Sequence, residues 1–243
     1  MAHTPLHRIV PGADTAVIFI HGILGTPDHF GPFLSLVDRG ISVLNLLLDG
    51  HGTGVREFSH TSMAKWESQV DRAVDSALAT HRRVYLAAHS LGALLAIEQA
   101  AKKPIAGLFL LAVPIRLGVK PRVFSTSWKV FRGRIRPDDL FTRAALDCCG
   151  IRQSKNPLLY FGWLPRFVEL FAKIRKIQKL LPGLSVPGTA YQSAKDELVS
   201  AASVPYLSQH SGLRVCVLEN STHYYYDPQD LMLLQRSFSD LLS

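Results

Sequence analysis

Residues 84–100 are VYLAAHSLGALLAIEQA, an apolar run followed by one serine and then by a run with helical character. This order predicts a buried strand, a sharp turn with Ser90 at its apex and a helix, which is typical of a nucleophile elbow. The elbow pattern is G-x-S-x-G, and Ala88 replaces the first glycine here. Ala88 and Gly92 are both small, as required where the strand and helix backbones approach closely. Taken alone, the pentad fits a catalytic serine and, equally, an ordinary turn in which Ser90 caps the helix.

Apolar runs and helical patterns alternate along much of the chain. The predicted strands are residues 15–20, 41–46, 84–88, 105–113, 188–192 and 213–218. Helices are predicted after Thr26, over 61–80, over 91–100, around 200–208 and after Asp227. This alternation predicts an α/β fold with a doubly wound, mostly parallel sheet and helices on both faces.

Residues 114–187 interrupt the alternation. We therefore predict one α/β core, formed by residues 1–113 and 188–243, with residues 114–187 inserted as a helical lid. The formal net charge of the chain is +8, and most of the excess lies in this insertion.

Within the insertion, residues 165–181 resemble an amphipathic helix. Its expected apolar face holds Phe167, Leu170, Phe171, Ile174 and Ile177, and its basic face holds Lys173, Arg175, Lys176 and Lys179. We expect the apolar face to cover a site and the basic face to be solvated. A transient contact of the basic face with an anionic membrane surface is the alternative. Nucleic acid is not an expected partner, because no recognised binding motif accompanies the charge.

The cysteines and the termini bound the class of protein further. Cys148, Cys149 and Cys216 show neither a disulfide framework nor metal-ligand spacing. The first residues lack the apolar core of a signal peptide, and no run has the length of a membrane-spanning helix. We expect a cytoplasmic protein, monomer or homodimer, with no metal and no cofactor.

Three residues in the predicted strand-end loops carry the chemistry of nucleophilic catalysis. A serine needs an adjacent base, and the base needs an orienting acid. Ser90, Asp196 and His223 each follow a predicted strand, and the carboxyl ends of parallel strands meet at one edge of a sheet. We predict that they form a catalytic triad.

Each member of this triad has a structural alternative. His223 could be an ordinary loop histidine, and Asp196 could cap a helix while another acid, such as Asp147, orients His223. Asp227 has the position of the cap of the last helix.

With these residues in view, the sequence resembles the α/β-hydrolases, and among them the compact bacterial carboxylesterases and monoacylglycerol lipases. The segments that carry the resemblance are HGILG at 21–25, DGHG at 49–52, the elbow, KDELV at 195–199 and STH at 221–223. The Ser, Asp, His chain order is also that of the family. The resemblance implies that the backbone N–H groups of Ile23 and Leu91 form an oxyanion hole. We expect His21 to shape the oxyanion loop by hydrogen bonding, and Asp49 and His51 to be structural.

The predicted activity is hydrolysis of carboxylic esters through an acyl-enzyme. Apolar residues near the site favour a small apolar acyl ester, such as a monoacylglycerol, with Phe30 and His89 contacting the substrate. A thioesterase, an aryl (feruloyl-type) esterase or a serine aminopeptidase would use the same triad. An alternative from another class is a non-catalytic ligand-binding module that keeps the hydrolase fold.

Overall fold

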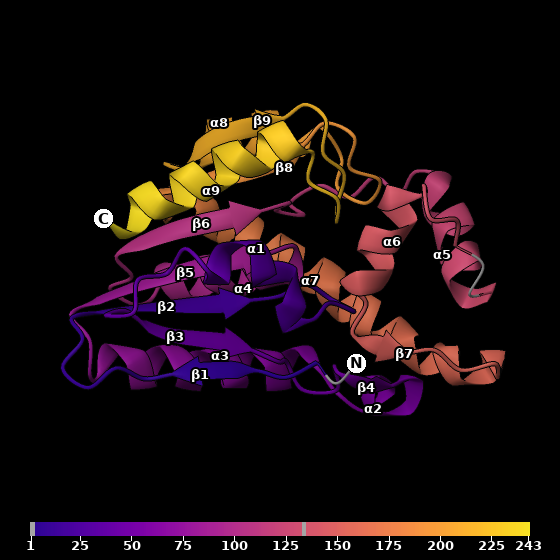
Figure 1. Cartoon of the computed structure of the whole chain (residues 1–243), viewed down its shortest axis with the longest axis horizontal. Coiled ribbons are helices and arrows are strands. Elements are labelled where there is room, and N and C mark those ends of the chain that lie inside the picture. The colour runs from indigo at the N-terminus through magenta and orange to yellow at the C-terminus, as the bar shows by residue number, and fades with distance from the viewer. Residues whose placement is uncertain (1–2, 133–134) are drawn as a thin grey trace.

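The computed structural model describes residues 3–132 and 135–243. One sheet contains the strands β1 (Leu6–Arg8), β2 (Thr15–Ile20), β3 (Ser42–Leu46), β5 (Arg83–His89), β6 (Gly107–Leu111), β8 (Gly188–Ser193) and β9 (Arg214–Leu218). Their order across the sheet is β1-β3-β2-β5-β6-β8-β9 (Figure 1). All neighbours are parallel except β1, which pairs antiparallel with β3.

The central strands are buried on both faces, and this is why their sequences are continuous apolar runs. In β2, Ile18 and Ile20 enter one hydrophobic cluster, whereas Val17 and Phe19 enter the cluster on the opposite face. Successive side chains of a strand point to opposite faces, so each of these residues has a core to fill.

Helices cover both faces of the sheet (Figure 1). One cluster takes side chains from α3 (Met63–Leu78), α4 (Leu91–Ala100), α7 (Leu164–Leu180) and α8 (Ser203–His210). The other cluster takes side chains from α1 (Gly31–Leu34) and α9 (Pro228–Leu242). The doubly wound, mostly parallel α/β fold predicted from the sequence is therefore confirmed.

Helix starts follow the capping residues in the sequence. Ser62 caps α3 by accepting a hydrogen bond from the Lys65 N–H at 3.2 Å, and Asp227 caps α9 by accepting one from Gln229 at 3.0 Å. The helix expected after Thr26 is much shorter than predicted. A 3-10 turn, η1 (Pro27–Phe30), precedes the single turn of α1. β1 was not predicted, because three residues are too few to show a pattern.

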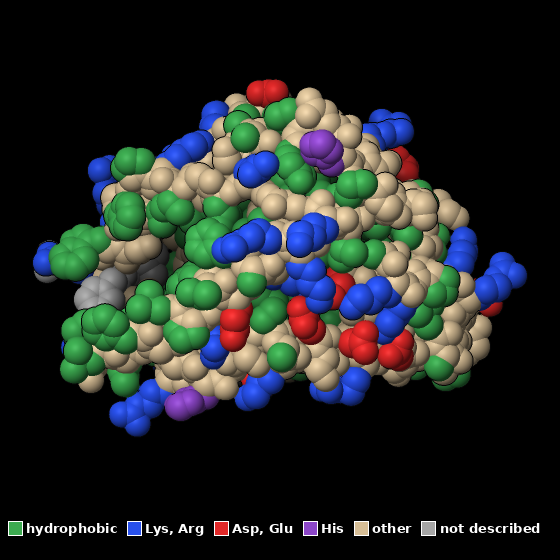
Figure 2. Space-filling view, turned by 180° about the vertical axis from the view of Figure 1, so that it is seen from behind, with side chains coloured by type: hydrophobic (Ala, Val, Ile, Leu, Met, Phe, Trp, Pro, Cys, Tyr) green, Lys and Arg blue, Asp and Glu red, His purple; other side chains and the backbone are tan. Residues whose placement is uncertain are grey.

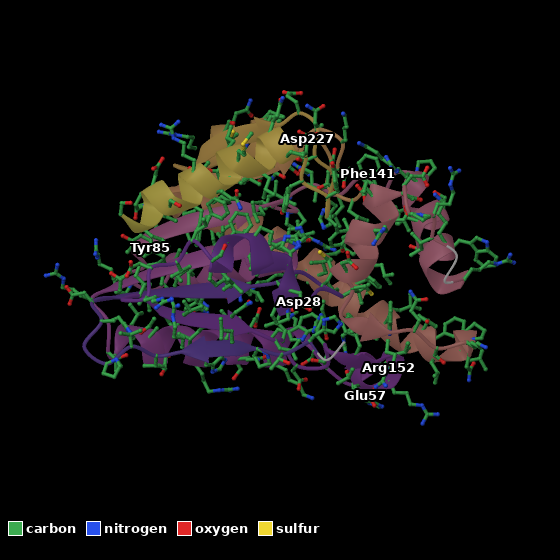
Figure 3. All side chains as sticks on the ribbon, viewed as in Figure 1. Asp28, Glu57, Tyr85, Phe141, Arg152 and Asp227 are labelled. Atoms are coloured by element: carbon green, nitrogen blue, oxygen red, sulfur yellow. The ribbon has the colours of Figure 1, made fainter. Side chains whose placement is uncertain are left out.

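The first part of the insertion stands beyond the carboxyl ends of the strands, at the right-hand end of Figure 1, whereas its last α-helix, α7, runs behind the sheet and packs on the core. It contains α5 (Arg122–Arg132), α6 (Leu140–Asp147), β7 (Ile151–Arg152), the 3-10 helices η2 (Pro157–Trp163) and η3 (Leu181–Gly183), and α7. A strand in this segment was not predicted from the sequence. β7 pairs in parallel with β4 (Thr53–Gly54), next to α2 (Val55–Ser59), and Figure 3 labels Arg152 and Glu57 at this junction.

The α7 helix is held to the core by charge as well as by apolar contacts. Lys173, expected on the solvated face, is 2% exposed; its Nζ donates to Glu67 Oε1 at 2.8 Å and to Glu98 of α4. Glu98 also pairs with Lys102 and with Lys176. Burial acts to raise the pKa of Glu98, but the three lysines outweigh it and lower this pKa to about 2. Part of the expected basic face of α7 is therefore neutralised against the core.

Phe171 of α7 also departs from the prediction, because its side chain is 49% exposed and does not belong to the covered apolar face. Within the described residues, no helix is both long and apolar enough to cross a membrane.

Candidate active site

Ser90 lies at the turn between β5 and α4, in the conformation that the elbow requires. Its φ is 52° and its ψ is −119°, a strained backbone for a residue other than glycine. The Ser90 N–H donates to the Leu111 carbonyl at 2.9 Å, which fixes the turn to β6. A Cβ at Gly92 would lie 2.0 Å from the Ile20 carbonyl oxygen, so only glycine fits there. Local strain of this kind is often found at functional sites.

Asp196 and His223 lie together in loops after β8 and β9. His223 Nδ1 and Asp196 Oδ2 are 2.8 Å apart, and both side chains are 2% exposed. The other carboxylate oxygen, Oδ1, accepts backbone N–H groups from Leu198 and Val199 at 2.7 and 2.8 Å. The imidazole therefore contacts a carboxylate that is itself fixed in place.

Electrostatics favour the charged forms of this pair. Burial acts to lower the pKa of His223, but the Asp196 carboxylate outweighs it, and the pKa is raised above its usual value. Burial acts to raise the pKa of Asp196, but His223 and the two backbone donors hold it below the usual range. Asp196 is thus an ionised acceptor that stabilises a protonated imidazole.

The loop of His223 packs against the elbow through His89, the residue before Ser90. His89 Nε2 donates to the His223 carbonyl oxygen at 3.0 Å, and the two rings are 4.7 Å apart. Burial, aided by neighbouring histidines, lowers the pKa of His89 well below its usual value, so it donates as a neutral ring. The three strand-end loops predicted to carry the triad thus meet at one edge of the sheet.

Neither alternative acid takes the place of Asp196 beside His223. Asp227 caps α9, as the sequence predicts, and Asp147 is an exposed residue at the end of α6. Asp196 accepts two backbone N–H groups through one carboxylate oxygen and contacts His223 through the other. It therefore acts as a capping residue and as the partner of His223 at the same time.

The loop at residues 21–25 packs directly on the serine. A Cβ at Gly22 would lie 2.9 Å from Ser90 Cβ and 3.0 Å from His89 Nδ1, so this close approach depends on glycine. His21 shapes the loop as predicted. Its Nδ1 donates to the Gly22 carbonyl at 2.8 Å, and its Nε2 accepts the Leu48 N–H at 3.1 Å.

Two groups from distant segments hold the backbone of Leu24, the next residue but one in this loop, whose φ is 59°. His51 Nε2 accepts the Leu24 N–H at 3.1 Å. The Gly150 N–H donates to the Leu24 carbonyl at 2.7 Å. Burial lowers the pKa of His51 to about 4, which keeps its ring neutral and able to accept. The two peptide groups that flank Leu24, directly after Ile23, are therefore each held by one hydrogen bond.

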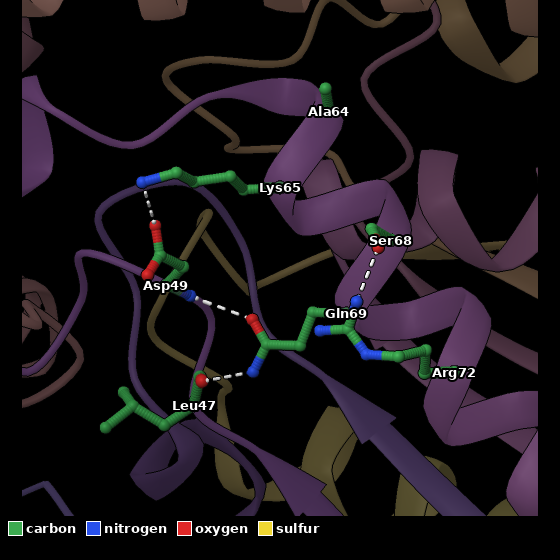
Figure 4. A pocket seen from close by; sticks show the side chains of 7 residues that line it. All are labelled: Leu47, Asp49, Ala64, Lys65, Ser68, Gln69 and Arg72. Atoms are coloured by element: carbon green, nitrogen blue, oxygen red, sulfur yellow. Dashed lines mark hydrogen bonds and ion pairs between the residues drawn. The ribbon is translucent and has the colours of Figure 1, made fainter.

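The loop that carries His51 is in turn anchored to α3 (Figure 4). Gln69 accepts the Asp49 N–H at 2.9 Å and donates to the Leu47 carbonyl at 2.7 Å, and the Asp49 carboxylate accepts from Thr61. Asp49 is thus structural, as predicted. The pocket of Figure 4 lies on this surface. The polar residues that line it form hydrogen bonds and an ion pair with one another, which indicates that they anchor the loop of His51 to α3.

Gly150 is a functional candidate that sequence reasoning did not identify. It lies between the adjacent cysteines and β7, and its own carbonyl accepts the Gly52 N–H at 2.7 Å. A Cβ at Gly150 would lie 2.1 Å from the Gly25 carbonyl oxygen. No local pattern in the sequence marks this contact, since it joins segments more than a hundred residues apart.

The contact of Phe30 with the substrate stays a prediction. Its side chain is fully buried in the core, with its ring 5.0 Å from that of Phe19. The observed packing of this residue, the last of η1, is therefore with the core. His89, also predicted to touch the substrate, is 2% exposed, and its Nε2 is occupied by the His223 carbonyl. Its observed contact positions the loop of His223.

The cysteines remain protonated thiols. Burial, aided by nearby acidic groups, raises the pKa of Cys148 to about 12, and burial also raises the pKa of Cys149 and Cys216. In the described part of the chain, no group of three or more His, Cys, Asp and Glu side chains has the arrangement of a metal site.

Several solved structures have a similar fold. Similar structures include one described with LipS and LipT, two metagenome-derived lipolytic enzymes, at 18% identity and a TM-score of 0.75, covering 99% of this chain and 98% of the other. A monoacylglycerol lipase from Paleococcus ferrophilus has 17% identity and a TM-score of 0.70, with 98% of each chain covered. Est1E from Butyrivibrio proteoclasticus, solved with ferulic acid, has 18% identity and a TM-score of 0.66, covering 98% of this chain and 93% of that one.

At these identities the likeness establishes the fold alone. Curated protein sequences gave no match. The family comparison establishes more than the fold. Residues 17–232 match the family model described as "Alpha/beta hydrolase family", and this range includes Ser90, Asp196 and His223. The chain belongs to the alpha/beta hydrolase family.

Proposed function

We propose that this hydrolase cleaves carboxylic esters of small apolar acids through an acyl-enzyme formed on Ser90. The observation that carries the proposal is the buried pair of His223 and Asp196, whose Nδ1 and Oδ2 atoms are 2.8 Å apart. The loop of His223 is hydrogen-bonded to His89, the residue before the strained Ser90. A buried base with a fixed acid beside a strained serine is the arrangement that activates a weak nucleophile.

In the proposed mechanism, Ser90 Oγ attacks the ester carbonyl carbon and its proton passes to His223. Nδ1 of this ring is bonded to Asp196, so Nε2 is the atom that takes the proton. The protonated ring then returns the proton to the leaving alcohol, and the acyl group stays on Ser90. Water attacks the acyl-enzyme by the same route in reverse and releases the acid.

We further propose that the N–H groups of Ile23 and Leu91 bind the oxyanion. Leu91 is the first residue of α4. Ile23 directly precedes Leu24, whose N–H is bound by His51 and whose carbonyl is bound by Gly150. Donors held in advance of the reaction stabilise developing charge without reorganisation, and losing one costs about 10²- to 10³-fold in kcat.

Replacing Gly150 with alanine is expected to lower kcat by about 10²-fold with little change in KM, because a shift of about 1 Å in a positioning group has this effect. The new Cβ would meet the Gly25 carbonyl at 2.1 Å, so the segment must move and its bond to Leu24 weakens. Steady-state kinetics measure the effect. Gly183→Ala, where a Cβ meets nothing within 4 Å, is the matched control. Equal kinetics for both variants would contradict the positioning role.

Ester substrates are supported by the similar structures, which are described with lipolytic enzymes, as a monoacylglycerol lipase and as Est1E with bound ferulic acid. A hydrolysis panel tests the class. It comprises p-nitrophenyl esters of increasing acyl length, a monoacylglycerol, a feruloyl ester, a thioester and a peptide amide. We expect turnover of apolar acyl esters, with the amide the poorest substrate. Failure to hydrolyse any carboxylic ester above the rate of a Ser90→Ala variant would overturn the proposal.

The role of residues 114–187 as a lid is likewise a proposal. It is supported by the place of the first part of the insertion beyond the carboxyl ends of the strands, where the loops of Ser90 and His223 meet (Figure 1). A cytoplasmic location and a monomeric or homodimeric state stay predictions from the sequence.

A further inference from the structure

Charge is divided very unevenly between the insertion and the rest of the chain. Residues 114–187 hold fifteen Lys and Arg but four Asp and Glu, a net charge of +11, whereas the remaining residues sum to −3. The excess positive charge of the protein is therefore a property of this one segment, and a segment so charged attracts anionic surfaces.

Exposed apolar side chains gather on the same segment. Of the sixteen large hydrophobic side chains exposed among the described residues, ten lie in the insertion. The most exposed are Phe124 of α5 at 71%, Leu158 and Phe161 of η2 at 68% and 66%, and Val168 of α7 at 67%. Isolated exposed hydrophobic residues are ordinary, but a group of them at one end of a molecule marks a binding surface.

The space-filling view shows where this surface lies. In Figure 2, turned by 180° from Figure 1, hydrophobic side chains gather at the left-hand end, which is the end formed by the insertion. Basic side chains stand around them, as Figure 2 also shows. We call the exposed apolar residues of α5, η2 and the first half of α7 the apolar tip. They are Phe124, Trp128, Leu158, Phe161, Leu164, Val168 and Phe171.

Several basic residues of the insertion keep their charge free for a partner. Lys120, Lys155 and Arg175 are exposed, and among the described residues they form no ion pair. Lys173 and Lys176, by contrast, are paired with Glu98 of the core. The basic side chains that remain available to a partner are therefore different from the lysines whose ion pairs hold α7 to the core.

We propose that the apolar tip and its basic rim dock the protein on an anionic phospholipid bilayer. Aromatic and aliphatic side chains would enter the boundary between headgroups and acyl chains, while Lys and Arg contact anionic headgroups. The charge selects this occupant. A second copy of the same surface would bring two segments of +11 together, and their repulsion disfavours such a dimer. Docking would turn the end of the molecule that carries Ser90 toward the bilayer.

Vesicle binding tests this inference without using catalysis, so its result is independent of the proposed hydrolysis. Sedimentation with phosphatidylglycerol vesicles is expected to capture the protein, and pure phosphatidylcholine vesicles to capture at least tenfold less. Raising the salt concentration should release much of the bound protein, because salt screens exposed charges. The Ser90→Ala variant should bind like the native chain.

A triple variant tests the apolar half of the surface. Phe124→Ser, Leu158→Ser and Phe161→Ser together are expected to weaken binding to phosphatidylglycerol vesicles at least tenfold. The matched control is Met232→Ser with Leu233→Ser on α9, which removes side chains that are 63% and 45% exposed outside the insertion. It should bind normally, and thermal unfolding should show that both variants fold.

Five results would overturn the inference. The first four are no capture by phosphatidylglycerol, equal capture by both lipids, equal loss of binding in the two variants, and conversion of a native dimer to a monomer by the triple variant in light scattering. The fourth result would assign the apolar tip to a second copy. Release of the protein from vesicles by duplex DNA, with tight DNA binding that the triple variant retains, would assign the basic rim to nucleic acid and would also overturn it.

Discussion

Replacement of Ser90 by alanine is expected to reduce kcat for ester hydrolysis by about 10⁶-fold, the size of effect found when another serine hydrolase loses its nucleophile. The change removes the atom that forms the acyl-enzyme and leaves the backbone and the neighbouring packing in place. Hydrolysis of a p-nitrophenyl ester measures the loss, and thermal unfolding verifies the fold.

A serine elsewhere on the surface provides the control for this change. Ser239 of α9 is exposed and remote in sequence from the three loops of the site, so Ser239→Ala should keep native activity. Ester hydrolysis by the Ser90→Ala variant within about tenfold of the native rate would remove Ser90 from the mechanism, since triad members cost far more than this when replaced.

Asp196→Asn should lower kcat by about 10⁴-fold, as the corresponding amide does in another serine hydrolase, because the ring of His223 loses the carboxylate that orients it and stabilises its charge. The pH dependence should change as well. The base works only when neutral, and Asp196 raises its pKa, so native activity is lost as pH falls through a value above the usual 6.5. Without the carboxylate the pKa falls, and the acidic limb of kcat/KM moves to lower pH.

A neighbouring carboxylate separates this effect from a general loss of negative charge. Glu197 accepts the backbone N–H of His223 at 3.2 Å and raises the pKa of the ring less than Asp196 does. Glu197→Gln should therefore shift the acidic limb less and should retain far more of kcat. A pH profile of Asp196→Asn that coincides with the native profile would contradict the assignment of Asp196 as the orienting acid.

The sheet could be predicted from the sequence because its central strands are buried on both faces. Such strands are largely apolar along their length, as residues 16–20 are, and the helices between them repeat an apolar stripe. β1 and β7 could not be predicted, because of their length. At three and two residues they are too short to show periodicity, and they exist because β3 and β4 offer them backbone partners.

Contacts between residues that lie far apart in the sequence could not be predicted. The position of Gly150 against the oxyanion loop depends on how the insertion folds back, and nothing near Gly150 in the sequence encodes Leu24. Lys173 was placed on a solvated face because a lysine ordinarily belongs there, but Glu67 and Glu98 of other helices make its burial tolerable. Phe30 was expected near substrate and fills the core, since an apolar side chain serves both purposes equally well.

The pairing of His223 with Asp196 could be predicted from the sequence. Both residues are of the types a triad needs, both follow predicted strands, and they stand in the chain order of the family. The sequence identified the loops, and the structure shows that the two side chains meet at 2.8 Å with the acid held by two backbone N–H groups. Their role in catalysis rests on Ser90 acting as the nucleophile.

The measurement that tests this role most directly is the site of covalent labelling by a fluorophosphonate. The native protein should react in a time-dependent manner, lose its esterase activity in parallel, and carry the label on the peptide that contains Ser90. The Ser90→Ala variant should stay unlabelled. An unlabelled native protein that is shown to be folded, or a label on any residue other than Ser90, would contradict the account.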